Sequence, residues 1–259
     1  MSRLHVRAQK GKAIRITPES AGWKHVGFEV RELAPGESAS AKTADREVCL
    51  VLVSGKAEIN DFGLLGERMT PFEGKPHAVY VPGGAEWRVK AKTPVSLAVC
   101  SAPWNRGKHP ARHIRPEDMS QETRGKGTNV RYVTNILPED APADSLLVVE
   151  VITPGGHTSS YPPHKHDTDN LPAESSLEET YYHRVNPPQG FAFQRVYTDD
   201  RSIDEAIVVE DGSVVMVPRG YHPVAAVHGY DLYYLNGMAG PRRTWKFHNA
   251  PEHEWLVQK

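Results

Sequence analysis

The hydrophobic residues of this chain form short runs that are rich in β-branched side chains and are separated by turn sequences. The turns include Ser54-Gly55, Pro82-Gly83-Gly84, Pro154-Gly155-Gly156 and Asp211-Gly212. Short strands at steady spacing between such turns are typical of β-sandwiches and β-barrels. The pattern therefore predicts an all-β protein with strands near residues 48–53, 78–81, 96–99, 146–151, 191–193, 206–209 and 213–217.

Sustained helical periodicity is scarce along the chain. The best helix candidate is the short segment 116–119, where a proline and two acidic residues suit a helix N-terminus. The surrounding stretch, residues 104–127, is basic, polar and poor in β-branched residues. We expect it to connect two β-rich halves rather than to bind nucleic acid, because it is short and the overall charge is balanced.

The order of turn signals repeats between the two halves. In each half, a Pro-Gly turn is followed by a glutamate at a strand start, a glycine, and a second Pro-containing turn after another strand. These are Pro35-Gly36, Glu47, Gly55 and Pro82-Gly83-Gly84 in the first half and Pro154-Gly155-Gly156, Glu179, Gly190 and Pro218-Arg219-Gly220 in the second. The repeat predicts two related β-barrels, in residues 1–125 and 126–259, with insertions in the second.

Composition and charge narrow the function. The 259 residues carry 31 Lys and Arg against 32 Asp and Glu, so the formal net charge of −1 supplies no long-range attraction to nucleic acid. The sequence has no signal pattern and no apolar run long enough to span a membrane, so we expect a cytoplasmic protein without a nucleic-acid or membrane partner. The two cysteines, Cys49 and Cys100, lie in apolar runs and are expected to be buried free thiols.

The candidate chemistry lies in the second half. His164 and His166 stand at i and i+2, so on a strand their imidazoles project to one face while Lys165 points away. Glu179 opens a later strand, and His222 follows a further strand and turn. Three imidazole nitrogens and one carboxylate oxygen suit Zn, Mn, Fe or Ni and leave positions open for a substrate.

This pattern resembles the cupin family. The His pair, Glu179 and two flanking glycines match the first cupin motif, and the turn at Pro218-Arg219-Gly220 with His222 matches the second. The sequence departs from the family in two places: a polar insertion of 12 residues separates His166 from Glu179, and His222 comes one place early. Because of the insertion, Glu178 is a rival to Glu179 as the carboxylate ligand.

The first half resembles a cupin barrel without a metal site. Lys42 and Ala44 stand at the two early His positions, Trp87 stands at the late one, and Glu47 stands where the family has its Glu. Lys, Ala and Trp do not coordinate metals as imidazole does. The resemblance therefore implies one divalent ion per chain, bound in the second barrel, with Zn favoured over Mn, Fe and Ni, and a structural role for the first barrel.

Longer segments resemble the bicupin sugar-acid isomerases, a family that includes the 5-deoxy-glucuronate isomerases of myo-inositol catabolism and the related 4-deoxy-5-hexosulose-uronate ketol-isomerases. The resemblance implies an aldose–ketose isomerisation of 5-deoxy-D-glucuronate to 5-dehydro-2-deoxy-D-gluconate through an enediolate, and it covers essentially the whole chain. The segments that carry it are residues 163–166, 179–183, 193–200, 217–223 and 233–241.

An isomerase of this kind needs a group that moves a proton between adjacent carbons. The candidates are His183 and Tyr181, which alternate onto the same strand face as the ligand glutamate, and Glu178. The carboxylate of the substrate needs a cation, and Arg195 and Arg219 are the candidates because a guanidinium binds a carboxylate in a two-pronged geometry.

Three alternative functions fit the same motifs. One is isomerisation of another uronate, such as 4-deoxy-5-hexosulose-uronate. Another is an iron-dependent cupin dioxygenase that uses the same ligands, and the third is a non-catalytic sugar-binding cupin. The fold does not separate them. In each case we expect a small sugar acid or organic acid as the ligand, and a homo-oligomer.

Overall fold

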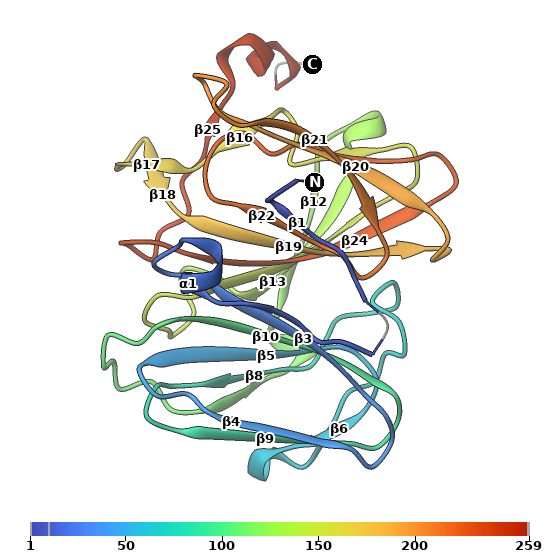
Figure 1. Ribbon diagram of the computed structural model, residues 1–259, viewed down its shortest axis with the longest axis vertical. Helices are drawn as coiled ribbons and strands as arrows, with labels where there is room; N and C mark the ends of the chain where they lie inside the picture. Colours follow the sequence, from blue (N-terminus) through green and yellow to red (C-terminus); the bar gives the residue numbers. More distant parts are fainter. Residues whose placement is uncertain (1, 10, 258–259) are drawn as a thin grey trace.

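The computed structural model describes residues 2–9 and 11–257, and these residues form two β-barrels stacked one on the other (Figure 1). The N-terminal barrel contains a six-stranded sheet that packs on a four-stranded sheet. The six strands, in spatial order, are β11 (Arg112–Ile114), β8 (Ala78–Val81), β5 (Arg46–Ser54), β10 (Val95–Pro103), β3 (Gly27–Leu33) and β2 (Ile14–Ile16). The four are β4 (Ser38–Lys42), β9 (Glu86–Ala91), β6 (Ala57–Ile59) and β7 (Leu64–Leu65).

The C-terminal barrel repeats this plan with additions. Its large sheet has the order β1 (His5–Val6), β22 (Val214–Val217), β19 (Glu178–Asn186), β24 (Asp231–Ala239), β14 (Leu147–Thr153), β13 (Arg131–Leu137) and β12 (Ser120–Arg124). The facing sheet has the order β15 (Thr158–Ser159), β23 (Val224–Ala226), β20 (Phe191–Tyr197) and β21 (Asp204–Glu210). Two further pairs are β16 (His164–Lys165) with β25 (His248–Asn249) and β17 (Asp167–Asn170) with β18 (Glu174–Ser176), and the second of these pairs is built from the insertion.

The helices are short. They are α1 (Pro18–Ala21) and the 3₁₀ turns η1 (Asn60–Phe62), η2 (Pro116–Asp118), η3 (Gly127–Asn129) and η4 (Pro251–Leu256). The helix expected at residues 116–119 is thus a single 3₁₀ turn. In the described part of the chain, no helix has the length and apolar character needed to cross a bilayer. The all-β prediction is confirmed.

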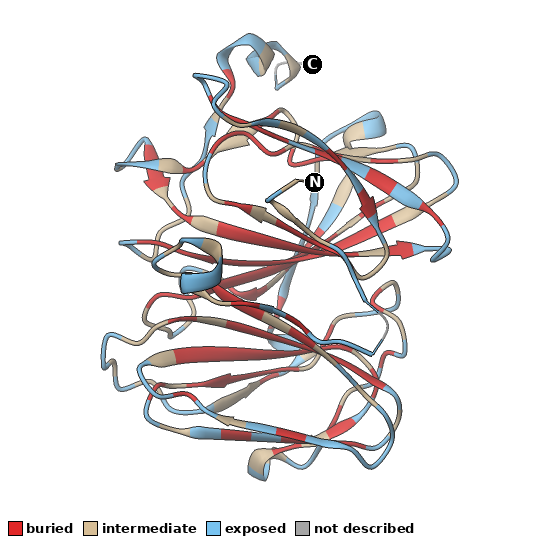
Figure 2. Ribbon diagram, viewed as in Figure 1, coloured by how far each residue is buried: buried red, intermediate tan, exposed pale blue. Residues whose placement is uncertain are grey.

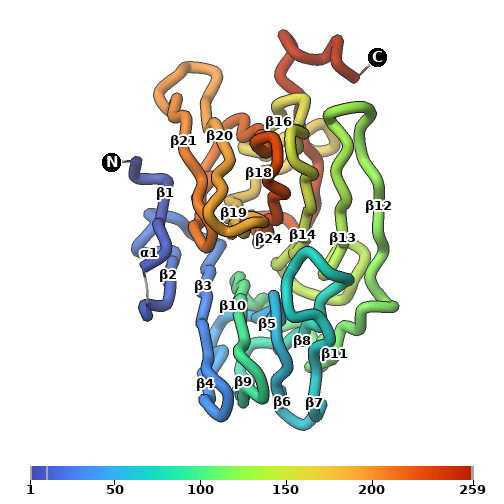
Figure 3. The backbone as a smooth tube through the Cα atoms, turned by 90° about the vertical axis from the view of Figure 1, so that its right-hand side faces the viewer, coloured from blue at the N-terminus to red at the C-terminus, as the bar shows by residue number. Residues whose placement is uncertain are grey.

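The two barrels share a core, and the first strand of the chain belongs to the C-terminal barrel. Strand β1, at the start of the chain, pairs with β22 of the C-terminal barrel, and the N-terminal segment runs along one side of both barrels (Figure 3). Strand β12 already belongs to the C-terminal sheet, so the crossover between barrels lies between β11 and β12, before the predicted boundary at residue 125. Buried residues concentrate along the two large sheets where they face each other (Figure 2). One apolar cluster there includes Phe28 and Cys49 from one barrel and Tyr182 and Tyr233 from the other.

The two cysteines lie in this shared core. Cys49 on β5 is directly opposite Cys100 on β10, and both are fully buried free thiols, as predicted. Burial raises the pKa of Cys49 to about 12. Neither thiol therefore carries the negative charge that a nucleophile needs at neutral pH.

Strand register defines which residues of the two barrels correspond. In the N-terminal barrel Val48 is opposite Val81, and in the C-terminal barrel Glu179 is opposite Val217. Val81 and Val217 each end a strand immediately before the repeated Pro-containing turn. Val48, an apolar residue, therefore occupies the position of Glu179.

The neighbouring strand on the other side, β10 for β5 and β24 for β19, gives the same correspondence. Glu47 is opposite Ala102, and Glu178 is opposite Ala239. Glu47 is thus the counterpart of Glu178, which corrects the expectation that Glu47 stands at the ligand position of the motif. Sequence spacing misplaced it by one residue because the loop before β19 carries the insertion, and a shift of one residue along a strand turns a side chain to the opposite face.

Candidate metal centre

Strand pairing brings His166, Glu179 and His222 together inside the C-terminal barrel. One ligand atom of each lies within 4.8 Å of the others, and in residues 2–9 and 11–257 this is the single group of His, Cys, Asp or Glu that meets such a limit. Glu179 Oε2 is 3.0 Å from Nε2 of His166 and 3.3 Å from Nε2 of His222. All three residues are at most 2% exposed. Two buried imidazoles and a carboxylate that converge in this way are a donor set for a divalent transition metal.

Each imidazole is oriented through its Nδ1, so that its Nε2 faces the cluster. His166 Nδ1 is 3.2 Å from the carbonyl oxygen of Leu177, and His222 Nδ1 is 2.8 Å from that of Gly220. A carbonyl only accepts, so Nδ1 of each ring is the donor. Nε2 of His222 is then free to carry a lone pair, whereas Nε2 of His166 donates to the carboxylate of Glu179 at 3.0 Å. The buried Nε2 of His222 has no hydrogen-bond partner. An unpaired buried nitrogen that points at a second imidazole and a carboxylate fits a metal, which would supply the missing partner.

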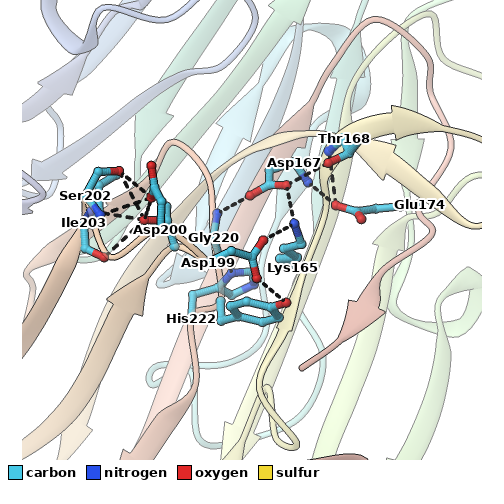
Figure 4. Close-up of polar contacts among 12 residues, drawn as sticks. Lys165, Asp167, Thr168, Glu174, Asp199, Asp200, Ser202, Ile203, Gly220 and His222 are labelled. Atoms are coloured by element: carbon cyan, nitrogen blue, oxygen red, sulfur yellow. Dashed lines mark hydrogen bonds and ion pairs between the residues drawn. The ribbon is translucent and has the colours of Figure 1, made fainter. Parts of the chain in front are cut away.

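Backbone geometry at Gly220 fixes His222. Gly220 has a φ of +90°, and a Cβ there would lie 2.4 Å from the carbonyl oxygen of Tyr197, so a larger residue would displace this turn. The amide of Gly220 donates to Asp167 Oδ2 at 2.8 Å (Figure 4). Asp167 therefore links the segment that follows the His pair to the turn that precedes His222.

A surface network continues from Asp167. Lys165 Nζ lies 3.2 Å from Asp167 Oδ1 and 2.8 Å from Asp199 Oδ2, and Asp199 accepts a hydrogen bond from Tyr221 at 2.9 Å (Figure 4). Lys165 thus points away from the flanking imidazoles, as strand alternation predicts. The network stabilises the loops that hold His166 and His222 from the outside.

His164 lies beside the cluster. Its ring centroid is 5.0 Å from that of His222 and 6.4 Å from that of His166. Burial lowers the pKa of His164 well below its ordinary value, and the neighbouring His222 and His166 add to this shift. It is not part of the three-residue group, so the structure places the early histidine at the edge of the centre, where it also lines the adjoining cavity.

Burial lowers the pKa of the two cluster histidines, whereas Glu179 raises it. Burial lowers the pKa of His222 to about 4, although the charge of Glu179 opposes the shift. Burial also lowers the pKa of His166, but the hydrogen bond and charge of Glu179 outweigh it and the net pKa is raised. A bound cation would replace the contact between His166 and Glu179, because both groups then bind the metal rather than each other.

A small cavity of about 30 Å³ lies beside Glu179. Its lining combines two cations, several hydroxyl groups and an apolar wall: Arg124, Arg131, Val133, Val149, Val151, Ser160, His164, Glu179, Tyr181, Tyr234, Asn236 and Trp245. Tyr181, one of the predicted candidates, is here, with its hydroxyl 3.0 Å from Ser160 Oγ. Ser160 Oγ is also 3.5 Å from the Tyr234 hydroxyl, so three hydroxyl groups form a short chain in the cavity wall.

The two cations of the cavity, Arg124 and Arg131, were not predicted from the sequence. Arg131 opens β13 and alternates with Val133, whose side chain packs in the barrel core, so Arg131 also faces inward. Among the described residues no carboxylate forms an ion pair with Arg131; its Nη1 donates to the carbonyl oxygen of Asn129 at 3.0 Å. Arg124 pairs with Glu122 and stacks over Trp245. The alternation of Arg131 with the apolar Val133 indicates an inward-facing side chain, but the basic stretch just before it is typical of a linker.

The predicted carboxylate-binding arginines lie elsewhere. Arg195 is exposed, forms a two-pronged ion pair with Asp204 at 2.8 Å and stacks on Tyr197. Arg219 is also at the surface, where it donates to Ser202 at 3.1 Å. Both belong to the outer face of the barrel, because odd and even positions of a strand face opposite ways and no local pattern shows which face is interior. The structure therefore places both predicted substrate-binding residues outside the cavity that Glu179 lines.

Two candidate proton-transfer residues are also outside the cavity. Glu178 points out of the C-terminal barrel, away from the cavity, and accepts hydrogen bonds from backbone amides of the N-terminal barrel. His183 lies behind Tyr181, with ring centroids 5.8 Å apart, and its Nε2 is 3.0 Å from Gln194 Oε1. Burial lowers the pKa of His183 to about 3. His183 supports the cavity wall rather than lining it.

The N-terminal barrel has no such centre at the corresponding positions. Lys42 and Ala44 are exposed, and Trp87 is 2% exposed within the apolar core of that barrel. Val48 replaces the ligand carboxylate. The positions that correspond to the metal ligands of the other barrel thus carry an exposed lysine, an exposed alanine and two buried apolar side chains.

The fold and the centre define a bicupin protein whose described residues contain one His/Glu cluster that could hold a metal ion, in the C-terminal barrel. The chain belongs to the KduI/IolB family, whose sequence model matches residues 2–256. The 5-deoxy-glucuronate isomerase of Geobacillus kaustophilus is 57% identical over 267 residues, with 100% of this chain and 96% of the relative covered. That of Geobacillus thermodenitrificans is 56% identical and covers 98% and 94%.

Solved structures agree with this placement. An IolB-like protein from Salmonella typhimurium superposes with a TM-score of 0.95 at 51% identity, over 99% of this chain and 100% of the other. Oxalate decarboxylase from Bacillus subtilis superposes with a TM-score of 0.65 at 13% identity, over 100% and 82%. The second likeness shows the bicupin fold alone.

Proposed function

We propose that this protein is a metal-dependent isomerase that converts 5-deoxy-D-glucuronate to 5-dehydro-2-deoxy-D-gluconate in inositol catabolism. The observation that carries the proposal is the convergence of His166, Glu179 and His222 next to a cavity that contains Arg131. An aldose–ketose isomerase for a sugar acid needs both features, one for the reacting oxygens and one for the carboxylate. The relatives named 5-deoxy-glucuronate isomerase, alike over nearly the whole chain, support the same substrate.

His166, Glu179 and His222 would hold one divalent ion, with His164 beside them as a further ligand. The nitrogen-rich donor set favours Zn and also suits Mn, Fe and Ni. When bound, the ion supplies Lewis-acid stabilisation of the negative charge that develops on the two oxygens of the enediolate.

Arg131 binds and orients the substrate carboxylate. The barrel interior partly desolvates its guanidinium, and burial lowers the pKa of Arg131 from its ordinary value without removing its charge. Since no carboxylate among the described residues occupies this guanidinium, it offers donors to an incoming anion. Arg124, on the same wall, adds positive charge, although Glu122 partly neutralises it.

The hydroxyl groups of Tyr181, Ser160 and Tyr234 form a chain in the cavity wall that can carry a proton. Burial, reinforced by Glu179 and Tyr234, raises the pKa of Tyr181 well above its ordinary value, so the phenol stays protonated and donates. Burial likewise raises the pKa of Tyr234. We assign Tyr181 as the donor to a substrate oxygen, with Ser160 as the relay to Tyr234.

The test is an anaerobic assay. The metal-loaded protein is incubated with 5-deoxy-D-glucuronate without oxygen, and the aldehyde proton and the new ketose are followed by NMR. We expect conversion that stops on addition of a chelator. Conversion that requires and consumes oxygen would favour an iron dioxygenase instead, and binding without turnover would favour a sugar-binding protein.

A further inference from the structure

Two glutamates, the partly buried Glu178 and the buried Glu47, connect the barrels reciprocally. Glu178 of β19 accepts hydrogen bonds from the consecutive amides of Lys24, His25 and Val26, at 2.8, 2.8 and 2.9 Å. These amides come directly before β3 in the N-terminal barrel. A carboxylate that accepts three amide protons fixes the relative position of both segments, because charge-assisted hydrogen bonds are short and strong.

Glu47 makes the mirror-image contact. Glu47 of β5 accepts from the consecutive amides of Asp144, Ser145 and Leu146, at 2.8, 2.6 and 2.6 Å. These residues come directly before β14 in the C-terminal barrel. Since β5 corresponds to β19 and β3 to β14 in sheet order, the two contacts are related by the pseudo-symmetry of the barrels.

Glu178 directly precedes Glu179, the carboxylate of the metal centre, in the sequence. Glu178 and Glu179 are the first two residues of β19, and their side chains face opposite sides of the strand. On the preceding side the chain is the inserted β17–β18 segment, which is tied to the centre by the hydrogen bond from the amide of Leu177 to the carbonyl oxygen of His166. The start of β19 is therefore held from outside by Glu178, at the point where Glu179 enters the cluster.

We propose that Glu178 is a positioning residue that uses the N-terminal barrel as an anchor to hold Glu179 in the geometry that binds metal. The proposal rests on the metal-binding function argued above. It assigns a role to the barrel that has no metal site: the amides of residues 24–26 present a rigid, pre-formed cradle to Glu178. A ligand held in place before the metal arrives binds it more tightly, because less ordering is left for the binding step.

Glu47 supplies a matched control within the same chain. It makes the same three-amide contact across the same interface and also accepts a hydrogen bond from the Tyr80 hydroxyl at 2.6 Å, but Val48, not a ligand, follows it. Loss of either carboxylate should weaken the contact between barrels. Only loss of Glu178 should disturb a metal ligand.

The experiment compares Glu178→Gln with Glu47→Gln. The metal-free proteins are titrated with Zn²⁺ against a chromophoric chelator, and the free energy of unfolding is measured in urea without metal. We expect both variants to lose stability, but only Glu178→Gln to bind Zn²⁺ about 10-fold or more weakly, the scale on which supporting residues act at metal sites. Glu178→Asp, which keeps the charge but shortens the reach, should lie between the wild type and Glu178→Gln.

The outcomes separate the inference from the proposed function. Unchanged Zn²⁺ affinity in Glu178→Gln, or an equal loss in Glu47→Gln, overturns the positioning role and leaves the metal centre standing. A wild-type protein that does not bind Zn²⁺, Mn²⁺, Fe²⁺ or Ni²⁺ overturns both. If Glu178→Gln does not fold, Glu178→Asp carries the comparison; if Glu47→Gln does not fold, Glu150→Gln, which breaks another buried contact between the barrels, replaces it as the control.

Discussion

Arg68 of the N-terminal barrel and Glu150 of the C-terminal barrel form a two-pronged ion pair in the shared core, with N–O distances of 2.8 and 3.0 Å and side chains only 3% exposed. Tyr233 donates a further hydrogen bond to Glu150 at 3.0 Å. Arg68 also donates to the carbonyl oxygens of Val53 and Gly74. With its charges paired and its donors satisfied, this group joins the two barrels as one folded unit.

Breaking this ion pair from one side should be costly. In Arg68→Met the carboxylate of Glu150 stays buried without its counter-charge, and we expect the free energy of unfolding to fall by about 3–5 kcal/mol. The double variant Arg68→Met, Glu150→Leu removes both charges and should recover part of that loss. Urea unfolding of the two variants and the wild type measures the difference. A double variant less stable than Arg68→Met would contradict this account.

Removal of the cluster ligands should abolish metal binding. We expect His166→Ala and His222→Ala to purify with little metal, and to lose activity on the order of 100-fold or more, because Lewis-acid stabilisation contributes several kcal/mol. Metal content by mass spectrometry and the isomerase assay check this. The exposed His228 provides the control: His228→Ala should keep both metal and activity. Metal and activity retained in His222→Ala would exclude the proposed centre.

The cation of the cavity should set affinity for the substrate carboxylate. Arg131→Met is expected to lower kcat/KM on the order of 30-fold or more, since loss of one partner of a desolvated charge pair costs about 2 kcal/mol or more. Arg195→Met, which removes an exposed arginine already paired with Asp204, should leave kcat/KM near the wild-type value. Steady-state kinetics of both variants show which arginine binds the substrate carboxylate. A large loss of kcat/KM in Arg195→Met and a small loss in Arg131→Met would restore Arg195 as the carboxylate-binding residue.

A stacked histidine pair in the N-terminal barrel should make stability fall in acid. His77 and His113 stack with ring centroids 5.0 Å apart, and His77 Nδ1 is 2.9 Å from His113 Nε2. Burial lowers the pKa of both, with a further lowering of His113 by the charge of His77. The nearby charges act in both directions: Glu67 and Glu117 raise the pKa of His77, and Arg68 lowers it.

The sign follows from proton uptake. As the pH falls below about 6.5, the ordinary pKa of histidine, the unfolded chain binds protons that the folded pair still refuses, so the free energy of unfolding decreases. We expect His77→Gln, His113→Gln to show a shallower decrease between pH 7 and pH 5. Urea unfolding at several pH values measures the slope. An identical slope in the double variant would show that other groups cause the acid sensitivity.

Much of the fold was predictable from the local pattern of the sequence. Alternating apolar runs between Pro and Gly turns predicted the strands, and the repeated order of turns predicted two barrels. Buried thiols at Cys49 and Cys100 followed from their apolar neighbours. The addition of β1 and β12 to the two edges of the C-terminal sheet was not predictable, because pairing of edge strands depends on surfaces that exist only after both barrels form. The expected homo-oligomer stays a prediction.

The residue types of the centre were predictable, but their neighbours were not. His166, Glu179 and His222 were named from spacing, since alternation along a strand is a local property. Arg195 and Arg219 were named by their charge alone, and the structure places both outside the cavity. Arg131 was overlooked because the basic stretch before it reads as a linker.

The sequence by itself determined that the chain is all β, that it repeats, and that only its second half carries imidazoles in the order of a metal site. The tertiary structure decided which glutamate enters that site, which arginine faces the cavity, and what the first barrel contributes. The physical reason is the two-residue period of a strand. Local sequence shows which side chains share a face, but only the pairing of distant strands decides which face becomes the interior.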